Sequence, residues 1–322
     1  MAVLLSGPSA LKHLRNERSR LSMPCAPNPR ETPNSFDAPT IEHKNIARKL
    51  LGHNFGELHF IVPNATQRRT ADDTHCSVHS RPFPRGSFYQ VNGDIYCLSP
   101  ERLFLQMHDH LSDIACIDLG HELCGTYARC GTDHVVHGLP PVTSTSKIKR
   151  YLLRCSGNRH VKRALINLGC VNDNSSSLRE THLAMLLCLP TRYGGGGLPK
   201  PVLNMPIDVS PQTNITWRND LRWTDIGWKD ARLGVEYDSN EFHSGSEKIA
   251  KDAERRILLM AAGYEIIVVT NDQFKRLREI QRVIAVIYRL LGLRQRCRTE
   301  GYLLKQQNLH RDILELSFRG RF

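Results

Sequence analysis

Several features that would narrow the possible functions are scarce or missing in this sequence of 322 residues. None of its 10 cysteines lies in a Cys-x-x-Cys pair, and the spacing of Cys116, Cys124 and Cys130 matches no zinc-binding pattern. No apolar run approaches the length of a membrane span. The apolar residues 1–6 are too short for the core of a signal peptide, and no basic residues precede them. We therefore expect a cytoplasmic protein with reduced cysteines.

Acidic residues are also in short supply. The chain has 32 Asp and Glu against 44 Lys and Arg, which gives a net charge of +12 and a pI of about 9.4. A basic excess of this size fits a polyanionic partner, above all a nucleic acid. Charge bears on association and not on fold, so a basic protein without a nucleic-acid role stays open as the alternative.

The residue pattern divides the chain into three parts, and its length allows two domains with cores. Residues 1–55 open with a basic stretch, continue with a Pro- and Asn-rich segment, and are predicted to be an N-terminal basic segment and linker. Residues 56–170 alternate β-rich runs with helix signals and predict an α+β domain for recognition or regulation. Residues 171–322 carry the chemistry.

Carboxylates gather on two predicted strands of this third part. The strands form a hairpin whose turn lies at residues 229–230, with Asp225 on the first strand and Glu236 and Asp238 on the second. Side chains two residues apart share a face of a strand, so Glu236 and Asp238 point the same way. Asp225 can reach this face from the partner strand, and His243 follows the second strand.

Carboxylates grouped in this way repel one another unless a cation neutralises them, and oxygen-rich sites suit Mg²⁺ or Mn²⁺. A metal held there binds a phosphodiester and activates a water molecule. The sequence therefore predicts that Asp225, Glu236 and Asp238 bind the metal. It also predicts His243 as a ligand, proton shuttle or general base, because imidazole titrates near neutrality.

The order of these residues resembles the PD-(D/E)XK nuclease superfamily. The matching pattern is Asp225, a hairpin turn, Glu236-x-Asp238, His243 and a later Asp-x-x-Arg at residues 252–255. The branch that it resembles contains the very-short-patch-repair endonucleases and related uncharacterised bacterial proteins, and the match covers about residues 177–291. The resemblance implies an α/β fold, with a restriction-endonuclease-like domain over residues 171–322 whose mixed central sheet is flanked by helices.

The resemblance also implies roles for single residues. Asp225 and Glu236 take acidic metal-ligand positions, and His243 matches a histidine of the repair-endonuclease branch. Asp238 falls where the repair endonucleases have Asp and many members of the superfamily have the catalytic Lys. Glu180, on the helix before the strands, matches the upstream glutamate of the superfamily.

Glu180 has a structural alternative. Ser177-x-x-Glu180 is the sequence of a capping box, in which the glutamate accepts a hydrogen bond from the backbone at the helix start. From the residues alone, capping and a role at the metal site stay open together.

Basic side chains on two predicted helices are candidates for phosphate contacts. Lys248, Arg255 and Arg256 follow the hairpin, and Arg282 and Arg289 lie on a later helix. Charged helix faces are in most cases simply solvated, and Arg255 is also spaced for ion pairs within its own helix. A face as unbalanced as that of the later helix fits phosphate contacts beside a nuclease site, and both interpretations stay open.

Two further segments carry structural expectations. Gly194–Gly197 is followed by Leu-Pro-Lys-Pro and not by the Lys-Ser or Lys-Thr of a phosphate-binding loop, so we expect a flexible connection. The apolar run Tyr264–Thr270 is typical of a central strand that is covered on both faces.

Together these features predict a metal-dependent DNA endonuclease that hydrolyses phosphodiester bonds, in DNA repair, in defence or in a toxin–antitoxin setting. The run from His59 to Arg102 is weakly similar to AbiEi-type antitoxins. The general pattern has Lys where this chain has Asp238, which favours an alternative: a non-catalytic, antitoxin-like DNA-binding regulator with a degenerate nuclease domain. We expect DNA as a partner, no membrane, and a partner protein if the chain belongs to a toxin–antitoxin pair.

Overall fold

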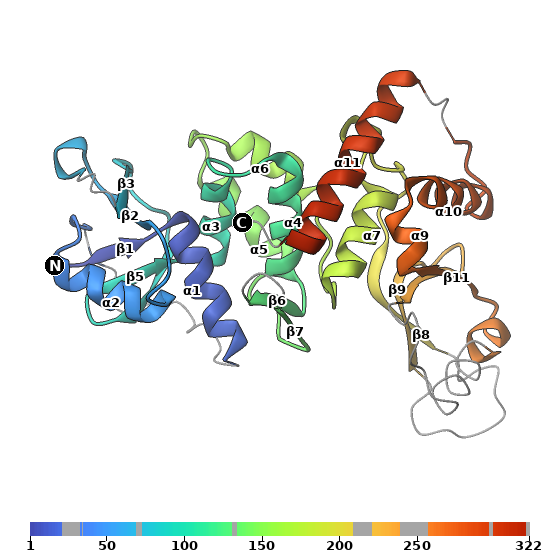
Figure 1. Cartoon of the computed structure of the whole chain (residues 1–322), viewed down its shortest axis with the longest axis horizontal. Helices are drawn as coiled ribbons and strands as arrows, with labels where there is room; N and C mark the ends of the chain where they lie inside the picture. Colours follow the sequence, from blue (N-terminus) through green and yellow to red (C-terminus); the bar gives the residue numbers. More distant parts are fainter. Residues whose placement is uncertain are drawn as a thin grey trace. The chain divides into compact units, whose positions relative to one another are not determined.

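The structure is a computed structural model that describes residues 1–20, 33, 35–68, 73–130, 134–208, 221–238, 257–295 and 299–319. The chain divides into two compact units, Met1–Cys124 with Ala128–Val171 and Gly125–Tyr127 with Asn172–Arg321 (Figure 1). Each unit combines helices with a mixed sheet, which confirms the α/β class. No helix in the described ranges is long and apolar enough to cross a bilayer.

The first unit is built on a five-stranded mixed sheet with the strand order β3-β2-β1-β5-β4. Its strands are β1 (Val3–Leu5), β2 (Leu58–Val62), β3 (Thr74–Val78), β4 (Phe88–Asn92) and β5 (Ile95–Leu98). Its helical segments are α1 (Gly7–Ser19), α2 (Ile41–Leu51), η1 (Ala65–Gln67), α3 (Pro100–Met107), α4 (Asp113–Cys124), α5 (Thr145–Arg154) and α6 (Val161–Leu168). β6 (Tyr127–Cys130) and β7 (His134–His137) form a separate two-stranded sheet.

The first residues of the chain form the middle of this sheet. All three residues of β1 are fully buried, and the strand pairs antiparallel with β2 and parallel with β5. In α1, Arg15 pairs with Glu122 at 2.6 Å, and Arg18 donates to the Glu122 carbonyl at 3.0 Å. The expectation of a basic segment ahead of the folded part is therefore wrong for residues 1–20, because β1 completes the sheet and the arginines of α1 bind a buried acid.

Local signals place the start of α3 as expected. Ser99 is its N-cap and accepts from the Arg102 amide at 3.3 Å, and Pro100 occupies the first helical position. The two strands before α3, β4 and β5, form an antiparallel hairpin, whose pairing shifts between Gln90 and Asn92.

The second unit contains a four-stranded mixed sheet with the order β11-β10-β9-β8. Its strands are β8 (Val202–Asp208), β9 (Leu221–Trp228), β10 (Leu233–Asp238) and β11 (Glu265–Thr270). Its helical segments include α7 (Leu178–Cys188), η2 (Thr191–Tyr193), α9 (Asn271–Lys275), α10 (Leu277–Leu290) and α11 (Glu300–Arg319). β8, β9 and β10 are antiparallel neighbours, β10 and β11 are parallel, and α7 packs against β9 and β10. The predicted hairpin is therefore present, whereas a restriction-endonuclease-like identity stays a prediction.

β11 is an edge strand in the sheet of the described residues, with β10 as its neighbour. Only Val269 of its six residues is buried. The expectation of a central strand covered on both faces is wrong, because an unbroken apolar run does not reveal how many neighbours a strand has.

The helices after β11 also differ from the single last helix that the sequence indicated. Thr270 caps the short helix α9, the backbone at Arg276 is extended, and α10 starts directly afterwards. The buried residues of α10 recur at helical spacing: Ile280, Val283, Ile284 and Ile287. The sequence had given no expectation of the further helix α11.

Gly194–Gly197 is a close-packed junction and not a flexible connection. A Cβ atom added at Gly194 or Gly195 would collide with backbone carbonyl groups of facing segments. The hydroxyls of Tyr288 and Tyr302 donate to carbonyl oxygens of this run at 3.0 and 3.1 Å. The glycines are needed because they let the chain after α7 approach α10 and α11 without side chains in between.

Candidate active site and cationic surfaces

Asp225 and Glu236 lie on neighbouring strands of the second unit. β9 pairs antiparallel with β10 up to the pair Val235–Ile226. The next positions along this register are Glu236 and Asp225, and their facing on one side of the sheet, which strand alternation predicts, stays a prediction. Both side chains are half-buried, which strengthens any interaction between their charges and a cation.

Side chains bond to the backbone of β10 at this point. The carboxylate of Asp225 accepts a hydrogen bond from the Tyr237 amide at 2.7 Å, and the Thr224 hydroxyl donates to the Val235 carbonyl at 3.3 Å. These two bonds hold β9 and β10 together beyond their last register pair. They also fix one carboxylate oxygen of Asp225 against the backbone of the neighbouring strand.

Close approach of the strands depends on a glycine before Glu236. A Cβ added at Gly234 would lie 2.6 Å from the Thr224 hydroxyl oxygen and 2.7 Å from the Ile266 side chain. Gly234 therefore lets β9 and β11 both pack tightly against β10, next to the acidic pair.

Asn204 on β8 lies across from Asp225. Its position falls between the register pairs Leu203–Ile226 and Met205–Thr224. Its backbone has a φ of 47°, in the left-handed region that residues other than glycine rarely adopt within a strand. The side-chain amide of Asn204 donates to the backbone carbonyl of Asn174 at 2.7 Å. Asn174 also has a positive φ, of 66°. Asparagine adopts this region more readily than most residues, and the bond ties β8 to the segment before α7.

Glu180 reaches this place from α7. Its carboxylate accepts hydrogen bonds from the amide and the hydroxyl of Ser176, at 3.2 and 2.6 Å. The Ser176 hydroxyl oxygen lies 3.3 Å from the side-chain oxygen of Asn204. Ser177 caps α7 by accepting from the Glu180 amide at 3.1 Å. Capping by Ser177 is thus confirmed, but Glu180 bonds to Ser176, one residue earlier than a capping box requires, and connects through it to Asn204.

Asp238 ends β10, on the same face as Glu236 by strand alternation. It is half-buried and stands in parallel register with Thr270 of β11. The Tyr237 hydroxyl donates to the Asn271 side chain at 2.9 Å, which ties this end of β10 to the start of α9.

The metal prediction needs a smaller ligand set than the sequence indicated. Within the described part of the chain, no three or more His, Cys, Asp and Glu side chains are grouped closely enough to hold a metal ion. Asp225, Glu236 and Asp238 therefore do not form a three-carboxylate cluster on their own. Mg²⁺ keeps several water ligands and takes one or two carboxylates plus substrate phosphates, so a metal site of Asp225 and Glu236 alone stays a prediction.

Several predicted site residues lie outside the described residues: His243, Lys248, Arg255 and Arg256. Their proposed roles stay predictions.

Arg282 and Arg289 lie on the exposed side of α10, opposite its buried apolar face. Arg282 donates to Glu279 at 2.8 Å, so part of its charge is balanced within the helix. An exposed pair of this kind adds little stability and is easily exchanged for a phosphate contact. The cationic face predicted for this helix is thus present on the surface.

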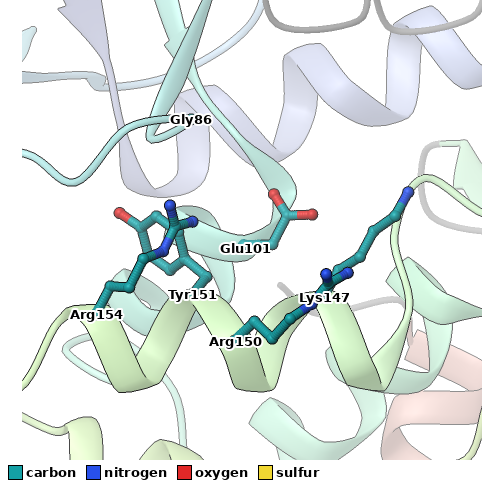
Figure 2. Close-up of a pocket in the computed structure, with 6 residues that line it drawn as sticks. All are labelled: Gly86, Glu101, Lys147, Arg150, Tyr151 and Arg154. Atoms are coloured by element: carbon teal, nitrogen blue, oxygen red, sulfur yellow. The ribbon is translucent and has the colours of Figure 1, made fainter.

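A second cationic surface, which the sequence reasoning missed, lies on α5 of the first unit. Figure 2 shows Lys147, Arg150 and Arg154 extending from this helix beside Tyr151, with Glu101 facing them. These side chains line a cavity of about 540 Å³. The residues of α5 include several lysines and arginines and no acid, and that imbalance was the signal available in the sequence.

Comparisons with known proteins give no family. No family model matches the chain, and no solved structure matches it. Two proteins of Mycobacterium tuberculosis, "Uncharacterized protein MT2308" and "Uncharacterized protein Rv2248", are each similar to part of it, at 35% identity over 131 residues. The match covers 41% of this chain and 44% of each relative, so the chain spans less than half the length of the curated relatives it matches. Their names state no activity, and the function must therefore be argued from the site.

Proposed function

We propose that the chain is a metal-dependent nuclease that hydrolyses phosphodiester bonds of DNA. The observation that carries this proposal is that two half-buried carboxylates, Asp225 and Glu236, occupy neighbouring strands just beyond the last register pair of β9 and β10. Glu180 on α7 supports it as a further acid of the same unit, because its carboxylate accepts from the hydroxyl of Ser176, which lies next to Asn204 on β8.

In this proposal Asp225 and Glu236 hold Mg²⁺ or Mn²⁺, and Asp238 supports them from the end of β10. The cation, when bound, polarises a phosphate oxygen and lowers the pKa of a water molecule. The bond from the Tyr237 amide keeps Asp225 in place before the substrate arrives. His243 exchanges a proton with the attacking water or the leaving oxygen.

Binding of DNA is assigned to the cationic surfaces. The net charge of +12 attracts a polyanion, and contacts with phosphates carry no sequence information. Arg282 and Arg289 on α10 serve the second unit, together with Lys248, Arg255 and Arg256. The basic face of α5 serves the first unit. Affinity should accordingly fall steeply as the salt concentration rises.

The test is cleavage of supercoiled plasmid in Mg²⁺ or Mn²⁺ by the wild type and by the Asp225→Asn and Glu236→Gln variants. We expect each variant to lose at least about 100-fold in rate, or ~2.7 kcal/mol of transition-state stabilisation. Asn keeps an acceptor for the Tyr237 amide, so the fold should be retained. Asp230→Asn is the matched control, since Asp230 is an exposed acid in the turn of the same hairpin, and it should cut like the wild type.

A non-catalytic DNA-binding regulator is the second candidate function. The observation that favours it is that the described residues hold no group of three metal ligands. In that case the wild type binds DNA in a salt-sensitive manner, with or without metal, and cuts none of the substrates. Cutting that Asp225→Asn and Glu236→Gln leave unchanged would contradict the proposed site as well.

A further inference from the structure

A buried arginine in the first unit has no carboxylate partner among the described residues. Arg102 on α3 is 7% exposed, and its Nε atom has no hydrogen-bond partner among the described residues. Its guanidinium lies 5.3 Å from the centre of the Phe83 ring, and one nitrogen lies 3.4 Å from Nδ1 of His79. No ion pair joins it to a carboxylate in the described part of the chain. A buried cation without a counter-charge is costly, and such a group is typical of an anion site.

Arg102 lines a cavity of about 770 Å³, a size usual for small-molecule sites. Arg81 and Arg159 line the same cavity, and Asp109 is the acid in its wall. Arg159 is 81% exposed and lies 3.6 Å from Asp109, so these two charges largely balance each other at the rim. The uncompensated positive charge of the cavity comes from Arg102 and Arg81.

An aromatic hollow adjoins this cationic cavity. It has a volume of about 530 Å³ and is lined by Phe36, Phe83 and Phe88 together with several prolines. The two spaces share wall residues, among them His79 and Arg81. The rings of Phe83 and Phe88 are half-buried and lie 5.8 Å apart edge to face. The ring of His79 lies 4.3 Å from that of Phe83, so Phe88 and the part of Phe83 that His79 leaves uncovered line the hollow.

We propose that the two spaces form one binding site for a nucleoside monophosphate unit. The phosphate binds Arg102 and Arg81, and the base packs against Phe83 and Phe88. Bases stack well on aromatic side chains, and guanidinium groups suit phosphate, so this pairing of surfaces fits that ligand chemistry. The unit is either a free mononucleotide or the 5′-phosphorylated end of a strand. The site is independent of the proposed nuclease, since all of its residues belong to the first unit.

His79 is set up as a neutral donor in this site. Arginine only donates hydrogen bonds, so Nδ1 of His79 accepts from Arg102 and the ring proton is on Nε2. Burial, together with the charges of Arg102 and Arg81, lowers the pKa of His79 to about 4. The imidazole is therefore uncharged at neutral pH and can offer its Nε2–H to a phosphate oxygen.

The experiment is calorimetric titration and thermal unfolding of the full chain with defined probes. The small probes are thymidine 5′-monophosphate, thymidine and inorganic phosphate, and the strand probes are a short oligothymidylate with and without a 5′-phosphate. We expect thymidine 5′-monophosphate to bind at least about tenfold more tightly than thymidine or phosphate alone, because only it fills both spaces. If the 5′-phosphorylated strand binds more tightly than the 5′-hydroxyl strand, and Arg102→Met removes that difference, the source is a strand end. If the two strands bind alike, the source is a free nucleotide.

Arg102→Met separates binding from a structural role. We expect it to weaken thymidine 5′-monophosphate binding by about tenfold or more, while the unliganded protein unfolds at the same or a higher temperature, since an uncompensated charge has been removed. Arg20→Met is the matched control, because it removes an exposed arginine of the same unit that lines neither space. Arg81→Gln, at the exposed rim, repeats the test should Arg102→Met fail to fold, and should cost at least about fivefold.

Absence of mononucleotide binding by the wild type would overturn the proposal. So would mononucleotide binding that both Arg102→Met and Arg81→Gln leave intact.

Discussion

Replacing Glu122 by glutamine should strongly destabilise the first unit. Glu122 on α4 is 2% exposed, and its carboxylate receives two bonds from Arg15, at 2.9 and 2.6 Å. It also accepts from the backbone amide of Arg129 at 3.1 Å. Burial raises the pKa of Glu122, but the charges of Arg15 and Arg129 outweigh burial and hold that pKa below its usual value.

The expected loss in the free energy of unfolding follows from the buried charge of Arg15, which the glutamine no longer compensates. Breaking a buried ion pair by neutralising one partner costs ~3–5 kcal/mol, because the other charge stays buried without compensation. Arg15 is 13% exposed and regains part of its hydration, so we expect a loss of about 3 kcal/mol in the free energy of unfolding. The matched control is Asp94→Asn, which breaks a bond between the terminal amine and a 61% exposed carboxylate and should cost less than about 1 kcal/mol.

Urea unfolding at pH 7 measures the loss of stability, and urea unfolding between pH 6 and 3 measures how that loss depends on pH. Because the folded-state pKa of Glu122 is depressed, its contribution is fully present above the unfolded-state pKa of ~4.3 and is lost as the pH falls through the folded-state value. The difference in stability between wild type and Glu122→Gln should therefore shrink below about pH 4. A loss of less than about 1 kcal/mol at pH 7, or a difference that does not change with pH, would refute this reasoning.

Three further outcomes follow from the described residues. Gly195→Ala places a Cβ against a backbone carbonyl and should cost at least about 2 kcal/mol in urea unfolding, whereas Gly56→Ala, with open space around it, should be close to neutral. Asn204→Gly keeps the left-handed backbone but removes the bond to Asn174, so cleavage should fall while the unfolding midpoint changes little; an unchanged cleavage rate would exclude Asn204 from the site. Burial, together with His75 and His110 and against Glu57, lowers the pKa of His59 to about 4, so below pH 6.5 the unfolded chain binds a proton that the folded chain does not. Stability should fall between pH 6.5 and 4 by at most ~1.4 kcal/mol per pH unit, and His59→Gln should reduce that slope.

Local signals predicted the elements that depend on neighbouring residues. The β9–β10 hairpin has a turn between two strands, and α3 starts with a serine cap followed by proline. The pairing of β9 with β10 followed from strand patterns and a turn that lie within one short segment, whereas the facing of Asp225 and Glu236 stays a prediction.

The sequence did not predict elements whose place depends on residues far away in the chain. β1 has only three residues, and its place in the sheet is decided by β2 and β5, which lie far away in the sequence. The glycines at 194–197 predict a flexible segment when read alone, because their packing partners, α10 and α11, follow about a hundred residues later.

The sequence also did not predict which residues surround the candidate site. A left-handed backbone at Asn204 has no sequence signature beyond the residue type, and its link to Glu180 passes through a serine that no motif marks. Nothing in the sequence distinguishes Arg102 from the other arginines. Only the structure shows that it lies beside Phe83, His79 and a cavity.

Binding of Mn²⁺, followed by electron paramagnetic resonance, tests most directly whether Asp225 and Glu236 form a metal site. The wild type and the Asp230→Asn control should each bind about one Mn²⁺, and the double variant Asp225→Asn/Glu236→Gln should bind none at the same concentration. Mg²⁺ should displace the Mn²⁺. No Mn²⁺ binding by the wild type, or binding that the double variant retains, would contradict the proposed site whatever the cleavage assay shows.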